Sequence, residues 1–304
     1  MEERKIKIGT RASKLALVQT DLVIEAIKEV CPDLDFEIVT YDTVGDKNLD
    51  KPLTEFGSQG IFVEEFEEKI LNGEIDIAIH SAKDMPIELP KGLEILSVLK
   101  REDPRDVLVT TDIEAFKNKR SAIVGTSSLR RELQIKRHYS NVQCKPIRGN
   151  VIARLEQLES GIYDGIVLAA AGLKRLNLHQ EARYQYKYFG VDEFIPAPGQ
   201  GIIAIEGRED NRWIDILHKI CDKNSRMELL IERSLYSLWQ ASSYEDTDFK
   251  EAYSIYSKVK NDTADIWILK KMDGEIKKVN IREKIDSKGG FHGKSIFSWS
   301  RAWE

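Results

Sequence analysis

A lysine and an aspartate follow an apolar segment of this chain directly. In "EIDIAIHSAKDMP" (74–86) a nearly continuous apolar run is typical of a buried central strand, and it ends in His80, Ser81, Lys83 and Asp84. Sheets in α/β proteins bind their ligands at the carboxyl ends of their strands. We therefore interpret Asp84 as a candidate acid, base or stabiliser of a developing cation, and His80 as an interior residue.

A basic segment supplies the second set of candidate residues. Between Ser121 and Arg154 the one acidic residue is Glu132, and the basic ones are Arg130, Arg131, Lys136, Arg137, Lys145, Arg148 and Arg154. Helix N-termini bind anions, and arginines hold carboxylates or phosphates with paired hydrogen bonds. The cluster predicts an anionic ligand of either kind, although no GxxxxGK[ST] loop is present for a nucleotide. The alternative is a solvated basic face, above all for Lys136 and Arg137.

The elements that must position these residues form two similar series. The first third of the chain has a β-α-β-α-β pattern, with Ser13 as the expected N-cap of its first helix and Asn72-Gly73 ending the second. "SAIVGTSS" (121–128) then repeats the pattern of "KIKIGTRAS" (5–13). In addition, two pairs of residues match at one constant offset, Gly73 with Gly161 and Asp76 with Asp164. We expect two related α/β halves, with Arg11 facing the basic cluster across a shared cleft.

A third, smaller unit is expected after the two halves. "PAPGQGIIAIEGR" (196–208) has the Pro-Gly content of a domain crossing, followed by a strand. Beyond residue 213 the pattern indicates a helix around 227–239 and two hairpin strands in 251–260 and 264–271, closed by Asp273-Gly274. This is the composition of a small α+β domain, and the last fifteen residues have little pattern.

Composition excludes several function classes. A chain of 304 residues with 41% hydrophobic residues and a net charge of −5 is an ordinary globular protein and not a general nucleic-acid binder. No apolar run is long enough to span a membrane, and the N-terminus lacks the apolar core of a signal peptide, so we expect a cytoplasmic protein. The cysteines and histidines have neither disulfide nor metal spacing, so no metal is predicted.

The motifs resemble one family, hydroxymethylbilane synthase, also called porphobilinogen deaminase. The similar stretches occur in family order over about the first 210 residues, and they are "IGTRASKLALVQ", "GIFVEEFEEKILNGEIDIAIHSAKDMP", "VGTSSLRR", "IRGNVIARLEQLESGIYDGIVLAAAGLKRL" and "PAPGQGIIAIE". The resemblance implies a transferase of porphyrin and heme biosynthesis. Its reaction joins four porphobilinogen molecules into hydroxymethylbilane, with loss of ammonia at each step, on a dipyrromethane cofactor that acts as primer.

The resemblance also implies a fold and a set of site residues. The fold would be α/β, with two periplasmic-binding-protein-like (type 2) domains and a small α+β domain. Domain 1 would comprise 1–100 and 197–213, domain 2 would comprise 101–196, and domain 3 would comprise 214–304, and the protein would be a monomer. Asp84 would be the catalytic carboxylate beside the pyrrole nitrogens. The carboxylate-binding residues would be Arg11, Ser13, Lys83, Thr126, Ser127, Ser128, Arg130, Arg131, Arg148 and Arg154, and the cleft would be lined by Phe62, Ser81 and Gln200.

The sequence departs from the family at the cofactor anchor. The family attaches dipyrromethane through a thioether to a cysteine of the third domain, whereas Ser242 or Ser243 falls at that position here and no cysteine follows Cys221. In addition, Gln59 replaces the lysine of a glycine-rich loop and Ala153 replaces a threonine. Three alternatives follow for the cofactor. It could be bound non-covalently, attached through Ser243, or attached through Cys221. The alternative function is a catalytically impaired homologue that binds a pyrrole or another polycarboxylate without turnover.

Overall fold

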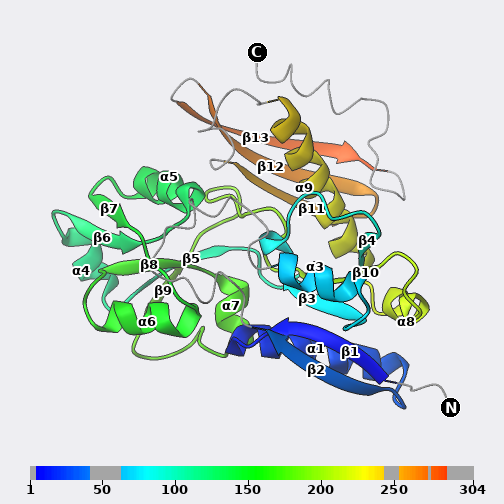
Figure 1. Cartoon of the computed structure of the whole chain (residues 1–304). Coiled ribbons are helices and arrows are strands. Elements are labelled where there is room, and N and C mark those ends of the chain that lie inside the picture. Colours follow the sequence, from blue (N-terminus) through cyan, green and yellow to red (C-terminus); the bar gives the residue numbers. More distant parts are fainter. Residues whose placement is uncertain (1–4, 42–62, 243–252, 273–274, 286–304) are drawn as a thin grey trace.

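The structure is a computed structural model that describes residues 5–41, 63–242, 253–272 and 275–285 (Figure 1). The described elements occur in the order β1 (Lys5–Arg11), α1 (Lys14–Val30), β2 (Asp35–Tyr41), α3 (Glu64–Leu71), β3 (Ile77–Ser81), η2 (Ala82–Asp84), β4 (Leu93–Val98), β5 (Asp106–Thr110), α4 (Ile113–Asn118), β6 (Ala122–Gly125), α5 (Leu129–His138), β7 (Val142–Lys145), α6 (Val151–Glu159), β8 (Gly165–Ala169), α7 (Ala170–Arg175), β9 (Gln185–Tyr188), β10 (Ile203–Arg208), α8 (Ile214–Lys219), α9 (Lys223–Ser242), β11 (Ser254–Lys260), β12 (Thr263–Met272) and β13 (Glu275–Lys284).

Two sheets with the same topology form the two lobes of the molecule, called here the first lobe and the second lobe (Figure 1). The first lobe has the strand order β2-β1-β3-β10-β4, and the second has β7-β6-β8-β5-β9. In each, the first three strands are parallel and the last two pairings are antiparallel. Both sheets are therefore mixed, with β3 and β8 each between a parallel and an antiparallel neighbour. The chain crosses into each sheet from the other lobe as β10 or β5, and that strand runs opposite to the first three strands of its sheet.

The predicted duplication is confirmed at the level of single hydrogen bonds. Gly73 and Gly161 have the same left-handed backbone, each with φ +77°, where each ends a helix. Three residues later, Asp76 accepts a hydrogen bond of 2.8 Å from a backbone N–H of β1, and Asp164 accepts one of 2.8 Å from the equivalent N–H of β6. Each carboxylate thus links the start of a central strand to the neighbouring strand. The matched residues therefore have the same structural role in both halves.

This equivalence predicts matched costs for removing the two carboxylates. Asp76→Ala and Asp164→Ala should each lower the free energy of unfolding by about 1.5–3 kcal/mol, because each removes a charge-assisted hydrogen bond to the backbone. Urea titration followed by circular dichroism would measure the change. Asp33→Ala, at an exposed turn, is the control and should stay within about 0.5 kcal/mol of the parent chain. A cost at one position without the other would contradict the equivalence.

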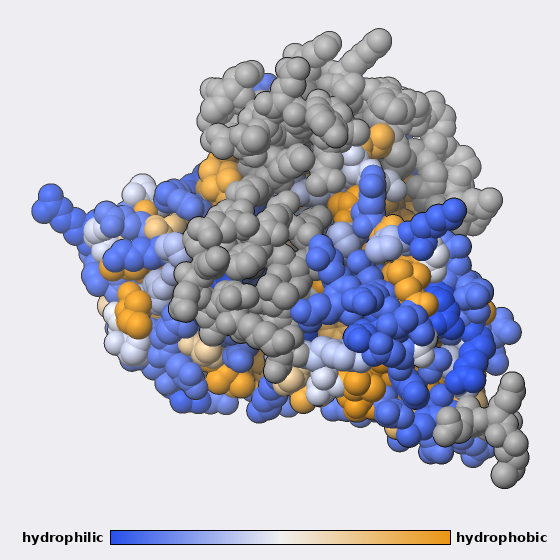
Figure 2. Space-filling view, viewed as in Figure 1, coloured by the Kyte–Doolittle hydropathy of each residue, from blue (hydrophilic) through white to orange (hydrophobic). Residues whose placement is uncertain are grey.

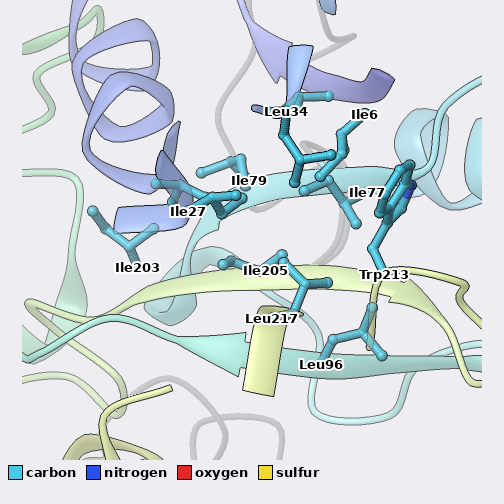
Figure 3. Packing of buried hydrophobic residues seen from close by; sticks show 12 residues of the cluster. Ile6, Ile27, Leu34, Ile77, Ile79, Leu96, Ile203, Ile205, Trp213 and Leu217 are labelled. Atoms are coloured by element: carbon cyan, nitrogen blue, oxygen red, sulfur yellow. The ribbon is translucent and has the colours of Figure 1, made fainter. Parts of the chain in front are cut away.

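The core of the first lobe explains why its elements form. In α1 the buried residues Ala16, Thr20, Val23 and Ile27 recur at helical spacing, and the Ser13 hydroxyl accepts a hydrogen bond from the Ala16 N–H, which confirms the predicted N-cap. Figure 3 shows the face of the sheet that α1 covers. There, strand isoleucines pack against α1 and against Trp213 and Leu217 in one cluster. The opposite face of β3 carries His80, which is buried as predicted, 3.0 Å from Glu206.

The third unit is a three-stranded antiparallel sheet, β11-β12-β13, packed against α9 (Figure 1). The helix and the first two strands confirm the sequence prediction. Ile231 and Leu235 of α9 pack with Ile255 and Ile266 of the sheet. The strand β13 was missed because "EIKKVNIREK" carries charged residues at most positions, as an edge strand can. Asp273-Gly274, the predicted hairpin turn, lies outside the described residues.

Two connecting segments join the lobes and run side by side. The first connection lies around Glu102, and the second connection lies around Gly201. The Glu102 N–H donates to the Gly201 carbonyl at 3.0 Å, and the Leu99 N–H donates to the Ile203 carbonyl at 3.1 Å. Gly201 has φ +90°, and a Cβ there would lie 2.4 Å from the Glu102 oxygen, so this crossing requires glycine. Arg101 lies in the first connection and donates to the Gln200 carbonyl at 2.8 Å and to Glu232 of α9 at 2.7 and 2.9 Å.

Hydrophilic residues predominate on the face shown in Figure 2, where hydrophobic residues lie in small scattered groups. None of the helices in the described ranges combines the length and the apolar character needed to cross a bilayer.

Candidate active site

A pocket of about 600 Å³ lies between the two lobes, at the carboxyl ends of β1, β3 and β8. Its lining comes from both lobes and from the second connection, and it includes Arg11, Ser13, Leu15, Gln19, Ser81, Lys83, Asp84, Arg131, Arg148, Gly149, Asn150, Val151, Ala153, Arg154, Leu168, Arg175, Gly201 and Ile202. The structure therefore brings together most of the residues that the sequence singled out. Among the described residues of this lining, only Asp84 contributes a carboxylate, and the remaining charged residues are basic.

Asp84 reaches the pocket because β3 ends one turn before it. The strand ends at Ser81, and the short η2 turn places Lys83 and Asp84 beyond the sheet edge. Asp84 is solvent-exposed, whereas Lys83 is partly buried and donates a hydrogen bond of 3.5 Å to Gln200. Ser81 accepts a hydrogen bond of 2.9 Å from Gln19 of α1. An exposed carboxylate thus stands beside a partly buried lysine.

Helix N-termini from both lobes point at this pocket. Ser13 begins α1, and Asn150 caps α6 by accepting a hydrogen bond of 3.0 Å from the Ala153 N–H. Both capping residues line the pocket. In the second lobe Ser128 caps α5 and accepts a hydrogen bond from the Arg131 N–H, although Ser128 itself is not in the lining. The positive ends of these helices favour an anionic ligand.

A buried carboxylate, Asp106, holds the two adjacent arginines of α5. Asp106 is fully buried at the start of β5 and accepts hydrogen bonds of 2.7 Å from Arg130 and 2.9 Å from Arg131. Burial raises the pKa of Asp106, but the two guanidinium groups outweigh that effect and bring the pKa down to about 2. Arg130 also donates to the Ile195 carbonyl at 2.9 Å and does not line the pocket.

Arg131 is held in place and still faces the pocket. Besides Asp106, it donates to the Val167 carbonyl at 2.9 Å. A guanidinium has more N–H groups than these contacts use, so Arg131 keeps donors for a ligand in the pocket that it lines. The arrangement presents a pre-oriented guanidinium to a carboxylate, which suits paired hydrogen bonds.

Burial weakens the hold of several pocket cations on their protons. Desolvation lowers the pKa of Lys83 to about 8, despite the opposing effect of Asp84. Desolvation also lowers the pKa values of Arg154 and Arg175 to about 10, and Arg131 adds to the effect on Arg154. An anionic ligand would relieve this crowding of positive charge.

The Lys83 pKa predicts a pH dependence of ligand binding. As pH rises through about 8, Lys83 loses its proton, so the affinity for a dicarboxylate ligand should fall. The loss of one charge-assisted hydrogen bond, about 1.5–3 kcal/mol, corresponds to about a tenfold rise in Kd or more. Calorimetric titration of the protein with a small dicarboxylate at about pH 7 and about pH 9.5 would measure the change in Kd. Lys83→Met should bind weakly at both pH values, and an unchanged slope in this variant would exclude Lys83 as the cause.

Several other predicted residues lie behind the pocket lining or outside the described chain. Thr126 accepts a hydrogen bond from the Ser128 N–H, and Ser127 bonds to the backbone of Ile147, so both brace the loop before α5. Gln200 is fully buried and donates to the Pro104 carbonyl at 2.6 Å. Residues outside the described parts are Phe62, Gln59 and Ser243, and Ser242 is the last residue of α9.

The sequence reasoning missed several contributors to the site. Arg175 and Gln19 line the pocket, and Asp106 orients Arg131. A usable signal existed for Asp106, because an acidic residue that begins an apolar strand, as in "DVLVT", needs a partner. Arg175 gave no comparable signal, since an arginine in the last turn of a helix is commonplace. The described residues hold no group of three or more His, Cys, Asp or Glu side chains placed to bind a metal.

Comparisons with known proteins identify the family of this chain. The family model described as "Porphobilinogen deaminase, dipyromethane cofactor binding domain" matches residues 6–215. The chain is 49% identical over 217 residues to a porphobilinogen deaminase of Ruminiclostridium cellulolyticum, which covers 71% of this chain and 72% of the relative. It is 42% identical over 233 residues to that of Bacillus subtilis, which covers 76% of this chain and 74% of the relative.

Two solved structures share a distant likeness with the chain. The VFT2 domain of BvgS from Bordetella pertussis is 17% identical with a TM-score of 0.43, and the match covers 72% of this chain and 87% of that domain. The LysR-family regulator CbnR is 11% identical with a TM-score of 0.44, and the match covers 72% of this chain and 70% of that one. The match to the family model, over more than half of the chain, is decisive: the chain belongs to the porphobilinogen deaminase family.

Proposed function

We propose that this protein is a hydroxymethylbilane synthase that condenses porphobilinogen in the pocket between its lobes, with Asp84 as the catalytic carboxylate. The observation that carries the proposal is the placement of one exposed carboxylate among arginines and a lysine drawn from both lobes. Porphobilinogen carries an acetate and a propionate on a pyrrole ring. Its carboxylates match the basic lining, and its ring nitrogen needs a hydrogen-bond acceptor.

The residues of the pocket would divide the work as follows. Arg131, held by Asp106, would bind a carboxylate of the substrate, and Lys83 would hold another beside Asp84. When the carbon–nitrogen bond of the aminomethyl group breaks, the electron pair leaves with ammonia and a cation develops over the pyrrole. Asp84 would accept a hydrogen bond from the ring N–H, and its negative charge would stabilise that cation. The methylene carbon then bonds to the free α-carbon of an acceptor pyrrole, which afterwards loses its proton.

The pocket also fits the dipyrromethane cofactor named by the matching family model. Dipyrromethane supplies the acceptor pyrrole on which the chain is built. Its several carboxylates suit Arg11, Arg148 and Arg154, which line the pocket around Asp84. These residues could hold and orient it, while the helix N-termini of α1 and α6 add favourable field. None of the cysteines lines the pocket, so the described residues fit the charge of this cofactor and not a thioether anchor.

We propose the same domain division that the sequence suggested, with 1–100 and 197–213 as domain 1, 101–196 as domain 2 and 214–304 as domain 3. The two hydrogen-bonded connections near Glu102 and Gly201 support it, because each joins one lobe to the other. We also propose that the protein acts as a monomer.

Consumption of porphobilinogen tests the proposal. Purified protein supplied with preformed dipyrromethane should consume porphobilinogen and release ammonia in equal amounts. Asp84→Asn, folded to the same extent, is the control. Folded protein that binds porphobilinogen without consuming it would sink the proposal and favour a binding protein.

A further inference from the structure

The thiols of this chain lie away from the pocket. All three cysteines fall within the described residues, and none belongs to the pocket lining. Cys31 directly follows α1 and packs against the core of the first lobe. Cys144 lies in β7, and burial together with Glu132 raises its pKa to about 11. Since a thiol reacts as its thiolate, Cys144 is protonated and unreactive at neutral pH.

Cys221 is the remaining thiol, and its contacts are structural. It follows α8 and packs against an apolar cluster that contains Ala82, Met85 and Ile202. Ile202 lines the pocket, but Cys221 does not. The thiol therefore lies within the packing beneath the site and not at its wall.

The pocket has the charge and size to hold a dipyrrole without a bond. Its cationic side chains are Arg11, Lys83, Arg131, Arg148, Arg154 and Arg175, against the carboxylate of Asp84. A dipyrrole with an acetate and a propionate on each ring matches this excess of positive charge. A volume of about 600 Å³ is within the range of pockets that enclose a ligand of that size.

We propose that this chain holds its primer as a dissociable, linear pyrrole polycarboxylate, through ion pairs in the pocket and without a covalent bond. The inference deepens the proposed function and rests on it. A primer held in this way leaves when salt screens the ion pairs, and it can be replaced from solution. The arginine that Asp106 orients, Arg131, then carries a large share of the affinity.

Mass measurement of the whole purified chain under denaturing conditions is the first arm of the test. We expect the mass of the bare polypeptide, both as purified and after incubation with porphobilinogen. Dialysis against about 1 M NaCl should remove any absorbance due to bound pyrroles. A mass increase equal to a dipyrrole would overturn the proposal and leave the proposed function intact. Cys221→Ala would then show whether Cys221 or another residue, such as Ser243, carries the adduct.

Binding of a synthetic dipyrromethane with two acetate and two propionate groups is the second arm. It should raise the Tm of the dialysed protein, because a ligand that binds only the folded state stabilises it. Arg131→Gln should raise the Kd of this compound by about tenfold or more. Arg120→Gln, at an exposed arginine outside the pocket lining, is the matched control and should leave the Kd unchanged.

The two arms separate this inference from the proposed function. A bare mass with no rise in Tm would overturn the inference, because the primer would then not be held at all. Saturable, salt-sensitive binding of the dipyrromethane supports it. If that complex binds porphobilinogen but never consumes it, the inference stands and the proposed function fails.

Discussion

Asp84→Asn is expected to slow porphobilinogen consumption by about a hundredfold or more, because it removes the carboxylate that would stabilise a developing cation. The same change should leave the fold nearly intact. Asp84 is exposed at the pocket wall, and in the described part of the chain its carboxylate accepts no hydrogen bond that the fold needs. Initial rates of ammonia release, together with the Tm from differential scanning fluorimetry, would measure both effects.

The binding behaviour of Asp84→Asn makes this prediction specific. Removal of a negative charge from a basic pocket should not weaken the binding of a pyrrole dicarboxylate. The Kd of the variant for this ligand should equal that of the parent chain or be lower. Asp33→Asn, at an exposed turn, is the matched control for the substitution itself. A variant that keeps more than about a tenth of the parental rate would rule out Asp84 as the catalytic carboxylate.

Asp106→Asn should produce the largest loss of stability among single substitutions at the site. It leaves Arg130 and Arg131 buried without their counter-charge, and breaking a buried pair in this way costs about 3–5 kcal/mol. Scanning calorimetry would show a lower Tm. Asp265→Asn is the matched control, because its partner Arg282 is 73% exposed and such surface pairs contribute about 1 kcal/mol at most.

The pocket should respond to the same change. Without Asp106, Arg131 loses the partner that orients it, so the Kd for a pyrrole dicarboxylate should rise by about tenfold. Arg130→Gln removes another contact of the same carboxylate, but Arg130 does not line the pocket. This second variant should lower the Tm with a smaller change in Kd. An Asp106→Asn variant with parental Tm and parental Kd would contradict both roles.

Acid should act through the same residue. The pKa of Asp106 lies near 2 in the folded protein, below its ordinary value near 3.8. The stabilisation from this carboxylate is therefore complete above the ordinary value and is lost as pH falls toward 2. Asp106→Asn should abolish that part of the acid sensitivity, which acid titration followed by circular dichroism would detect.

The fold was predictable from local patterns that repeat. Ser13 and the Asn72-Gly73 pair are short-range signals, and the structure confirms each as a helix end. The constant offset between Asp76 and Asp164 predicted the duplication, because one hydrogen bond imposes the same residue at both positions. The mixed strand directions were not predictable in this way, since β10 and β5 enter their sheets from the opposite lobe.

The site was predictable where chemistry and motif coincide at the end of an element. Lys83, Asp84 and Arg131 met that condition, and all three line the pocket. Asp106 was missed because its partners lie 24 and 25 residues away along the chain, and only the packing of α5 on β5 brings them together. The sequence motif alone also could not reveal that Arg130 faces Asp106 and not the pocket.

The contacts of Arg101 restrict how the two lobes can move. Its guanidinium bonds to the second connection at Gln200 and to Glu232 of α9, and Glu232 also accepts a hydrogen bond of 2.6 Å from the Gly199 N–H. The side chain of Arg101 is only 3% exposed. Separating the connections from α9 would therefore leave a buried cation without its carboxylate partner. We therefore expect both connections and α9 to move together as one unit. A lobe movement that widens the cleft would then require the backbone to bend outside the two connections. The small C-terminal sheet, which packs on α9, would move with them.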